Sequence, residues 1–252
     1  MKDYTSSNPA FGEKVWNRIT PAFDVAPSTA TIQGTVNKTL ILIGLLFFTA
    51  IGSWTFASQS TSTEWFLPMV LVTTIAQLIL TYLIISKPER SQTLGVVYAL
   101  LEGVVLGALS FLFERLFPGI VIQAILGTSG VIAGMMILYK TQIIKVTENF
   151  KLMVVAATFG LAFLYLASMI ANLFGSSIPF IHNNSTIGIL FSLFAIGVAA
   201  FNLAIDFDFI EKCEEKKSPA YMEWYGAFGL LVTIVWIYIE MLRLLSKLRS
   251  KD

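Results

Sequence analysis

Three carboxylic acids lie within or at the end of apolar runs in the C-terminal part of this chain. Glu240 lies inside the run LLVTIVWIYIEMLRLL, and Asp206 and Asp208 close the preceding run, FNLAIDFDFIE. A carboxylate in hydrocarbon is costly, by about 2.5–3.5 kcal/mol for Asp on membrane-insertion scales. If these runs cross a membrane, each acid is therefore a candidate functional residue.

Two carboxyl groups that meet in such a place could sense protons and bind a cation. Burial disfavours the charged form of a carboxyl group, and a second carboxyl close by disfavours it further, so the two groups share a proton. A pair that has lost both protons can recruit a hard cation such as calcium through its oxygen atoms. Asp206 and Glu240 could form this pair if they lie on neighbouring helices.

A local ion pair is the competing interpretation of Glu240. Arg243 follows it by three residues and Lys247 by seven, so all three lie on one helical face. An ion pair with Arg243, whose long side chain can extend toward the membrane surface, would explain Glu240 without a second acid. The sequence leaves open whether Glu240 reaches Asp206 or pairs within its own helix.

Other polar residues of the apolar runs are secondary candidates. Asn202 lies one helical turn before Asp206 on the same face, and Glu102 lies near the middle of an earlier run, YALLEGVVLG. Gln77 is predicted to form a hydrogen bond between helices. Asp208 points to a different side, nearer the charged segment that follows, and is predicted to be a solvated acid at a helix end.

Composition and length require membrane helices around these acids. The chain has 252 residues, 56% of them hydrophobic and only 13% charged, with a mean hydropathy of +0.74. Soluble domains carry about 25% charged residues. Seven apolar stretches are long enough to cross a bilayer as helices, and we expect an all-α membrane protein with seven transmembrane helices. The stretches cover residues 39–56, 65–85, 93–113, 119–139, 152–174, 187–205 and 224–245.

The distribution of Lys and Arg predicts the orientation and leaves one question open. With a cytoplasmic N-terminus, nearly all of these residues lie inside, and the outer loops carry only Arg115. The C-terminal tail is the exception, because with seven spans it lies outside although it carries several basic residues, Arg243, Lys247, Arg249 and Lys251. Either the last helix crosses fully against the rule, which we prefer, or it re-enters and returns to the cytoplasm.

Residues 1–38 are polar and are predicted to form a cytoplasmic arm in front of a helical domain, 39–252. Phe11, Val15 and Ile19 recur every four residues and predict a short amphipathic helix on the membrane surface. A partly ordered tail without a role is the alternative.

Small residues predict two close helix contacts. Gly103 with Gly107, and Gly130 with Gly134, form GxxxG patterns, which let membrane helices approach closely. We expect both to be packing seams within the chain rather than faces of a homodimer.

Motifs of soluble enzymes are missing from the sequence. It contains no GxGxxG, no Walker A and no CxxC pattern, and its only histidine, His182, falls in a predicted outer loop. The single cysteine, Cys213, excludes internal disulfides. We therefore expect neither enzymatic activity nor a nucleic-acid partner.

Three stretches resemble the Bax inhibitor-1/YccA family of membrane proteins, and in particular a bacterial branch of that family. They are NPAFGEKVW, TIQGTVNKT and YMEWYGAFGLLVTIVWIYIEMLRLLSKL. The acid that closes the sixth span and the acid within the seventh fit the same family, and the resemblance covers essentially the whole chain. It implies a fold in which six helices surround a central seventh.

The resemblance also implies functions and site residues. Members of the family are pH-sensitive calcium leaks, and some bacterial members bind and restrain a membrane-anchored AAA protease. The family's paired aspartates correspond to Asp206 and Glu240, with Glu in place of the second Asp. A basic residue at the end of the second helix partners the pair in some members, and Lys87 or Arg90 is its nearest match.

These observations lead to two hypotheses about function. The first is a multi-pass protein of the bacterial inner membrane that passes or senses calcium, gated by Asp206 and Glu240 and held closed by a basic residue near Lys87. The second is a regulator without transport activity that binds another membrane protein, such as a protease. A transporter of another solute is a third alternative. No cofactor is expected beyond calcium as a permeant ion, and the oligomeric state is left open.

Overall fold

The protein is a bundle of long helices. The computed structural model describes residues 28–60, 62, 64–174 and 184–250. In this part of the chain, seven helices are long and apolar enough to cross a membrane, and no extended strand is present. The helices are α2 (Ile32–Gln59), α3 (Phe66–Ser86), α4 (Ser91–Leu116), α5 (Ile120–Lys140), α6 (Glu148–Leu173), α8 (Thr186–Glu215) and α9 (Met222–Arg249), with a short 3₁₀ turn, η2 (Pro88–Arg90), between α3 and α4. The prediction of an all-α protein with seven spans is confirmed.

The first helix begins earlier than the apolar run predicts. Its N-terminal cap is Thr31, whose hydroxyl accepts a hydrogen bond from the Gly34 N–H at 2.9 Å, so α2 starts at Ile32 rather than at residue 39. Ser185 caps α8 in the same way, accepting from the Gly188 N–H at 3.2 Å. The amphipathic helix predicted around Phe11 lies outside the described residues.

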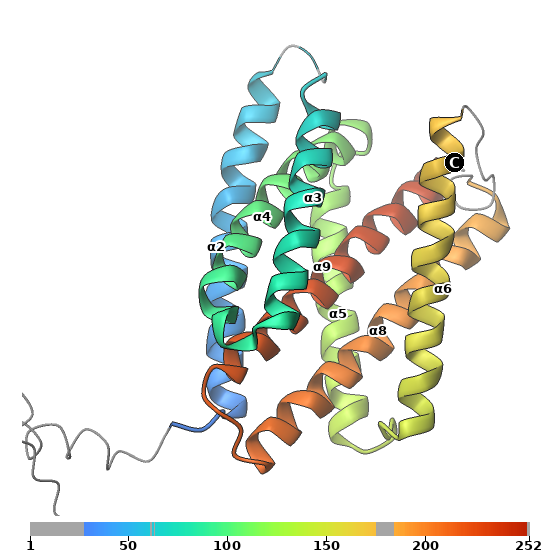
Figure 1. The fold of residues 1–252 in the computed structure, drawn as a ribbon. Helices are drawn as coiled ribbons and strands as arrows, with labels where there is room; N and C mark the ends of the chain where they lie inside the picture. The colour runs from blue at the N-terminus through green and yellow to red at the C-terminus, as the bar shows by residue number, and fades with distance from the viewer. Residues whose placement is uncertain (1–27, 61, 63, 175–183, 251–252) are drawn as a thin grey trace, which may run out of the picture.

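The last helix passes through the whole bundle. The start of α2 and the links α3–α4, α5–α6 and α8–α9 lie at one end, and the C-terminal end of α9 lies at the other (Figure 1). There Arg249 Nη1 donates a hydrogen bond to the Pro118 carbonyl in the α4–α5 link, at 2.7 Å. A last helix that re-enters and turns back is therefore not what the structure contains.

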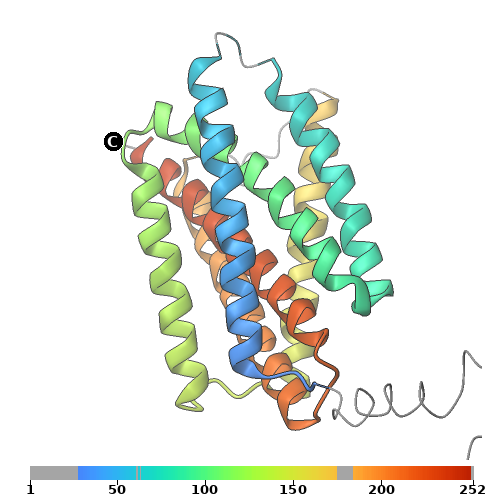
Figure 2. The same ribbon diagram turned by 90° about the vertical axis from the view of Figure 1, so that its left-hand side faces the viewer.

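The tightest helix contact joins α2 to α4 through glycine. A Cβ on Gly103 would lie 2.2 Å from the Leu46 carbonyl oxygen, and a Cβ on Gly107 would lie 2.1 Å from the Ala50 carbonyl oxygen. Any larger residue would separate the two backbones, so the first GxxxG pattern is an internal seam, as predicted. Figure 2 looks onto α2, with α5 on one side and α4 and α9 crossing behind it.

The second predicted glycine seam is wrong. A Cβ built on Gly130 or on Gly134 would meet no atom of the described residues within 4 Å. These glycines of α5 therefore permit no close helix approach within the described chain, because α5 packs against its neighbours through other faces.

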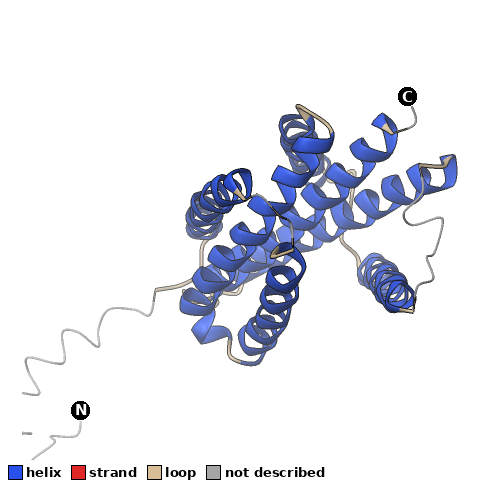
Figure 3. Ribbon diagram, turned by 90° about the horizontal axis from the view of Figure 1, so that it is seen from above, coloured by secondary structure: helices blue, strands red, loops and turns tan. Residues whose placement is uncertain are grey.

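Helix α9 is the most buried of the seven spans. It packs mainly against α2, α4, α5 and α8, whereas α3 packs on α4, and α6 packs on α8. Seen from above, two long tilted helices cross the bundle while others are viewed end-on (Figure 3). The direct neighbours of α9 support a central position, and the ring of six helices around it stays a prediction.

Candidate functional site

The Asp206 carboxylate is bound by the neighbouring helix. Its Oδ2 accepts a hydrogen bond from the Thr233 hydroxyl of α9 at 2.6 Å. Gly229, one turn before Thr233, lies beside the same carboxylate, since a Cβ there would be 3.7 Å from Asp206 Oδ1, an ordinary van der Waals contact. The acid that closes the sixth span therefore lies against the 229–233 turn of α9.

The Glu240 carboxylate has a different set of partners. Its Oε1 accepts hydrogen bonds from the Tyr165 hydroxyl of α6 at 2.8 Å and from Arg243 Nη1 at 2.9 Å. The Arg243 guanidinium also lies over the Tyr165 ring, 4.9 Å from its centroid. Glu240 is 1% exposed, and its second oxygen, Oε2, is buried without a hydrogen-bond partner in the described chain.

The antiparallel register of α8 and α9 explains why the two acids have separate partners. Asp206 of α8 faces Thr233 of α9. Fourteen residues earlier on α8, Ser192 faces Lys247, which lies fourteen residues after Thr233 on α9. The distance between Ser192 Oγ and Lys247 Nζ is 2.9 Å. Glu240 lies midway between Thr233 and Lys247, so this register places Ala199 of α8 opposite it. Alanine offers no polar group.

The structure therefore does not bring Asp206 and Glu240 together. Seven residues separate Thr233 from Glu240, which is about 10 Å along the helix axis at 1.5 Å per residue. Seven residues are also close to two full turns, so the side chains of Thr233 and Glu240 leave α9 on nearly the same side. The acids form two levels along one face, and the local ion pair with Arg243 is the interpretation of Glu240 that the structure contains.

The secondary candidates on α8 bind elsewhere. Asn202 Nδ2 donates to the Thr158 hydroxyl of α6 at 2.8 Å, although Asn202 lies one turn from Asp206. Asp208 accepts from Lys212 Nζ at 2.7 Å and pairs with Lys151 Nζ at 3.2 Å, and its side chain is only 14% exposed. Asp208 is thus an ion-paired acid rather than the solvated one we predicted, because α6 begins beside it.

The remaining candidates lie on α3, on α4 and in the turn between them. Glu102 is buried on α4 and accepts a hydrogen bond from Gln77 of α3, which confirms an interhelical role for this glutamine. Lys87 and Arg90 are exposed and form no ion pair within the described residues. Neither basic residue reaches Asp206 or Glu240.

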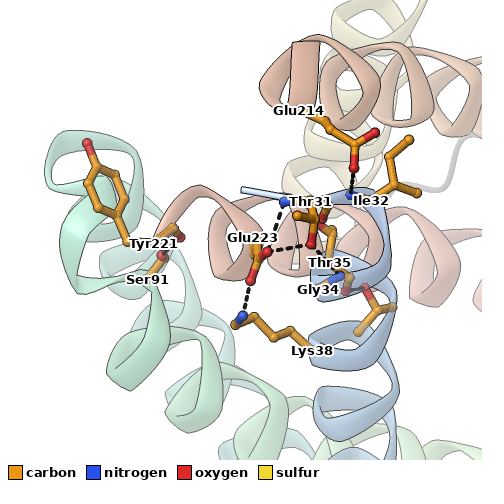
Figure 4. A network of polar contacts seen from close by, with 10 residues as sticks. Thr31, Ile32, Gly34, Thr35, Lys38, Ser91, Glu214, Tyr221 and Glu223 are labelled. Carbon is orange, nitrogen blue, oxygen red and sulfur yellow. Dashed lines mark hydrogen bonds and ion pairs between the residues drawn. The ribbon is translucent and has the colours of Figure 1, made fainter. Parts of the chain in front are cut away.

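A second acid of α9 was not among the predicted site residues. Glu223, in its first turn, is 6% exposed and accepts hydrogen bonds from the Thr31 N–H at 2.9 Å and the Thr31 hydroxyl at 2.8 Å (Figure 4). Its other oxygen forms an ion pair with Lys38 of α2. Gly34 leaves room for this carboxylate in its present position, since a Cβ there would lie 2.0 Å from Glu223 Oε1. The sequence features that could have indicated this contact are an acid in the first turn of the last helix and a lysine near the start of the first helix.

The contacts of Glu223 with Thr31 and Lys38 form a clamp between the first and last helices, and backbone contacts extend it. Thr29 and Pro219 form an isolated antiparallel bridge, in which the Ala30 N–H donates to the Ser218 carbonyl at 2.7 Å. Nearby, the Ile32 N–H donates to Glu214 Oε1 at 3.0 Å (Figure 4). The residues that precede α2 are therefore fixed to the α8–α9 link.

The oxygen ligands at Asp206 and at Glu240 are too few to hold a resident cation, and they are better suited to a cation that binds briefly. Calcium takes 6–8 oxygen ligands. No group of three or more Asp, Glu, His or Cys side chains that could hold a metal is found among the described residues. Each level instead offers one carboxylate together with a hydroxyl, from Thr233 at Asp206 and from Tyr165 at Glu240.

Seven membrane-length helices with carboxyl groups buried between them define a multi-pass membrane protein of the lipid bilayer. The family model described as Bax inhibitor 1 like matches residues 5–250, and the chain belongs to this family. Comparison with curated proteins gives no match.

Proposed function

We propose that this protein is a proton-sensitive cation leak or sensor of the bacterial inner membrane, with its N-terminus in the cytoplasm and calcium as the cation. It acts through two carboxyl levels along α9, Asp206 and Glu240, rather than through a contacting pair. The observation that carries the proposal is the Glu240 carboxylate, which is buried and has one oxygen without a hydrogen-bond partner among the described residues. The proposal assigns no catalytic activity to the chain.

In this proposal Glu240 is the proton-sensitive latch. The charged carboxylate holds α6 through Tyr165 and accepts from Arg243, and hydrogen bonds to a charged group are the stronger ones. The groups facing Glu240 are Tyr165 from α6 and Arg243 and Lys247 from α9. A proton on Glu240 would weaken both contacts and loosen α6, which packs mainly on α8. Flux should therefore rise as pH falls.

Asp206 has the complementary role of attracting the cation. Its carboxylate accepts a hydrogen bond from the Thr233 hydroxyl, so a cation could meet two kinds of oxygen ligand there. Removing its charge should reduce flux at every pH, because the attraction is lost whether or not the latch is closed.

Calcium flux into proteoliposomes across a pH series tests both roles. Glu240→Gln, which resembles the protonated acid, should give raised flux that no longer responds to pH. Asp206→Asn should lower flux throughout the series. Asp208→Asn is the matched control, because it removes an acid of the same helix that is already ion-paired, and it should leave the profile unchanged. Retention of the wild-type profile by Glu240→Gln and Asp206→Asn would sink the proposal.

A second candidate function is regulation of another membrane protein, such as a membrane-anchored AAA protease. The observation that favours it is the clamp between Thr31 and Glu223, which fixes the base of the N-terminal arm to the α8–α9 link. A partner that binds the arm could thereby act on α9. Deletion of residues 1–27 keeps the clamp and should abolish co-purification of the protease; unchanged co-purification counts against this candidate.

A further inference from the structure

A cavity of about 500 Å³ lies between α2, α4, α5 and α9, apart from the acid levels. Small-molecule sites commonly have volumes of about 300–1,000 Å³. Three of its apolar side chains, Phe47 and Ile51 of α2 and Ile125 of α5, are also exposed on the outer surface of the bundle. The cavity therefore opens between α2 and α5 toward the bilayer. Figure 2 shows α9 behind these two helices.

The wall of this cavity contains hydroxyl groups. Thr128 of α5 is 5% exposed, and its Oγ1 is buried without a hydrogen-bond partner among the described residues. Ser110 and Tyr238 line the same cavity, and their hydroxyls form a hydrogen bond of 2.7 Å. No charged side chain of the described residues lines it.

These hydroxyls define the chemistry of the molecule that fits. A pure hydrocarbon chain would leave the Thr128 hydroxyl unpaired, and a buried unpaired polar group is unfavourable. A carbonyl or hydroxyl group on the ligand would satisfy it, since a threonine hydroxyl both donates and accepts. A charged group is disfavoured, because the apolar walls offer it no counterion.

The depth of Thr128 restricts the ligand further. It lies eight residues after Ile120, the first residue of α5, which is about 12 Å along the helix. A phospholipid headgroup that stays at the membrane surface does not reach this depth. The polar group of the ligand must itself enter the hydrocarbon region.

We propose that this cavity binds a neutral lipid-soluble molecule, with an apolar body and one carbonyl or hydroxyl group, which enters from the bilayer between α2 and α5. Its polar group forms a hydrogen bond with Thr128, and its apolar body packs against the side chains of α2 and α5.

Trp54 provides a built-in probe, because it lines the same cavity. The full chain in vesicles of phosphatidylcholine is titrated with two bromine-labelled quenchers of equal chain length, 6-bromohexan-1-ol and 1-bromohexane, and quenching is compared as a function of the concentration of each probe in the membrane. The relevant signal is the quenching that is absent from Trp54→Phe, a variant that keeps an aromatic ring beside Phe111.

The alcohol should quench Trp54 with saturation, at a membrane concentration about two- to tenfold lower than the bromoalkane needs, the range expected for one net hydrogen bond. Thr128→Val keeps the shape of the side chain and should remove this difference between the two probes. Continued quenching of the variant by bromohexane shows that the cavity is still formed. Quenching by both probes without saturation, or an equal preference in the wild-type protein, would overturn the proposal.

Discussion

Glu223 and Glu240 are buried carboxylates of the same helix, and they are held in opposite ways. Both oxygens of Glu223 have partners, all of which come from the beginning of the chain, Thr31 and Lys38. Glu240 has a partner on its own helix, Arg243, and one on α6, Tyr165, and its second oxygen has no hydrogen-bond partner in the part of the chain that the structure describes. The two ends of α9 thus carry one fully satisfied acid and one partly satisfied acid.

This difference separates a structural acid from a functional one. A fully paired buried charge that joins distant segments stabilises one arrangement of them. A partly paired buried charge is tolerated where it serves function, and its state can change with one proton. We therefore expect substitutions at Glu223 to act on stability and substitutions at Glu240 to act on flux.

The largest effect is expected at the clamp. Glu223→Ala leaves Lys38 and the Thr31 N–H without their carboxylate. Loss of one partner of a buried ion pair costs about 3–5 kcal/mol, and we expect the lower end of this range because the Lys38 side chain is 22% exposed. Thermal unfolding in detergent micelles measures this loss. Glu215→Ala, at an exposed position of α8, is the control and should change little. A Glu223→Ala protein as stable as the control would remove the distinction between the two acids.

A smaller loss is expected when Glu240 loses its cation. Arg243→Ala leaves a buried carboxylate with Tyr165 alone, and a hydrogen bond to a charged group contributes about 1.5–3 kcal/mol. Protonation of Glu240 removes the unpaired charge, so the deficit should shrink as pH falls. Unfolding curves at neutral and acidic pH test the sign, and a deficit that grows on acidification contradicts this assignment.

The hydroxyl of Tyr165 should contribute about 1 kcal/mol, within the range of single hydrogen bonds. Tyr165→Phe keeps the ring beneath Arg243 and removes only the bond to Glu240. The same variant should show raised calcium flux at neutral pH, because α6 is held less firmly. Tyr139→Phe, which removes a hydrogen bond from α5 to Glu211, is the matched control and should not raise flux.

The smallest change in stability is expected for Glu240→Gln. The amide oxygen can still accept from Tyr165, and the buried charge is removed, so the two effects nearly offset one another and the change should stay within about 1 kcal/mol. Thermal unfolding of the Glu240→Gln protein, measured together with its calcium flux, shows whether the substitution changes flux without changing stability. A large loss of stability with an unchanged pH profile would reverse the roles of Glu223 and Glu240.

The register of the last two helices could have been derived from the sequence. The link between α8 and α9 covers residues 216–221 only, so residues equally far from its centre face each other. Asp206 lies ten residues before this link and Thr233 twelve residues after it, whereas Glu240 follows the link by nineteen. The resemblance to a family with paired acids favoured a contact between Asp206 and Glu240, whereas their unequal distances from the link argue against it.

Other contacts were beyond reach from the sequence, because they join helices that are not consecutive. Tyr165 and Thr158 meet Glu240 and Asn202 only through the position of α6 beside α8. The early start of α2 was missed because Lys38 interrupts the apolar run, and its charge is paired with Glu223 from the other end of the chain.

Cross-linking measures the register of Asp206 and Glu240 most directly. Cys213, the single native cysteine, is first replaced by serine. Asp206→Cys is then combined either with Thr233→Cys or with Glu240→Cys, and membranes are treated with the shortest bifunctional methanethiosulfonate. The two-level arrangement predicts efficient cross-linking of positions 206 and 233 and none of 206 and 240. Efficient cross-linking of 206 with 240 would contradict it and restore a contacting pair of acids.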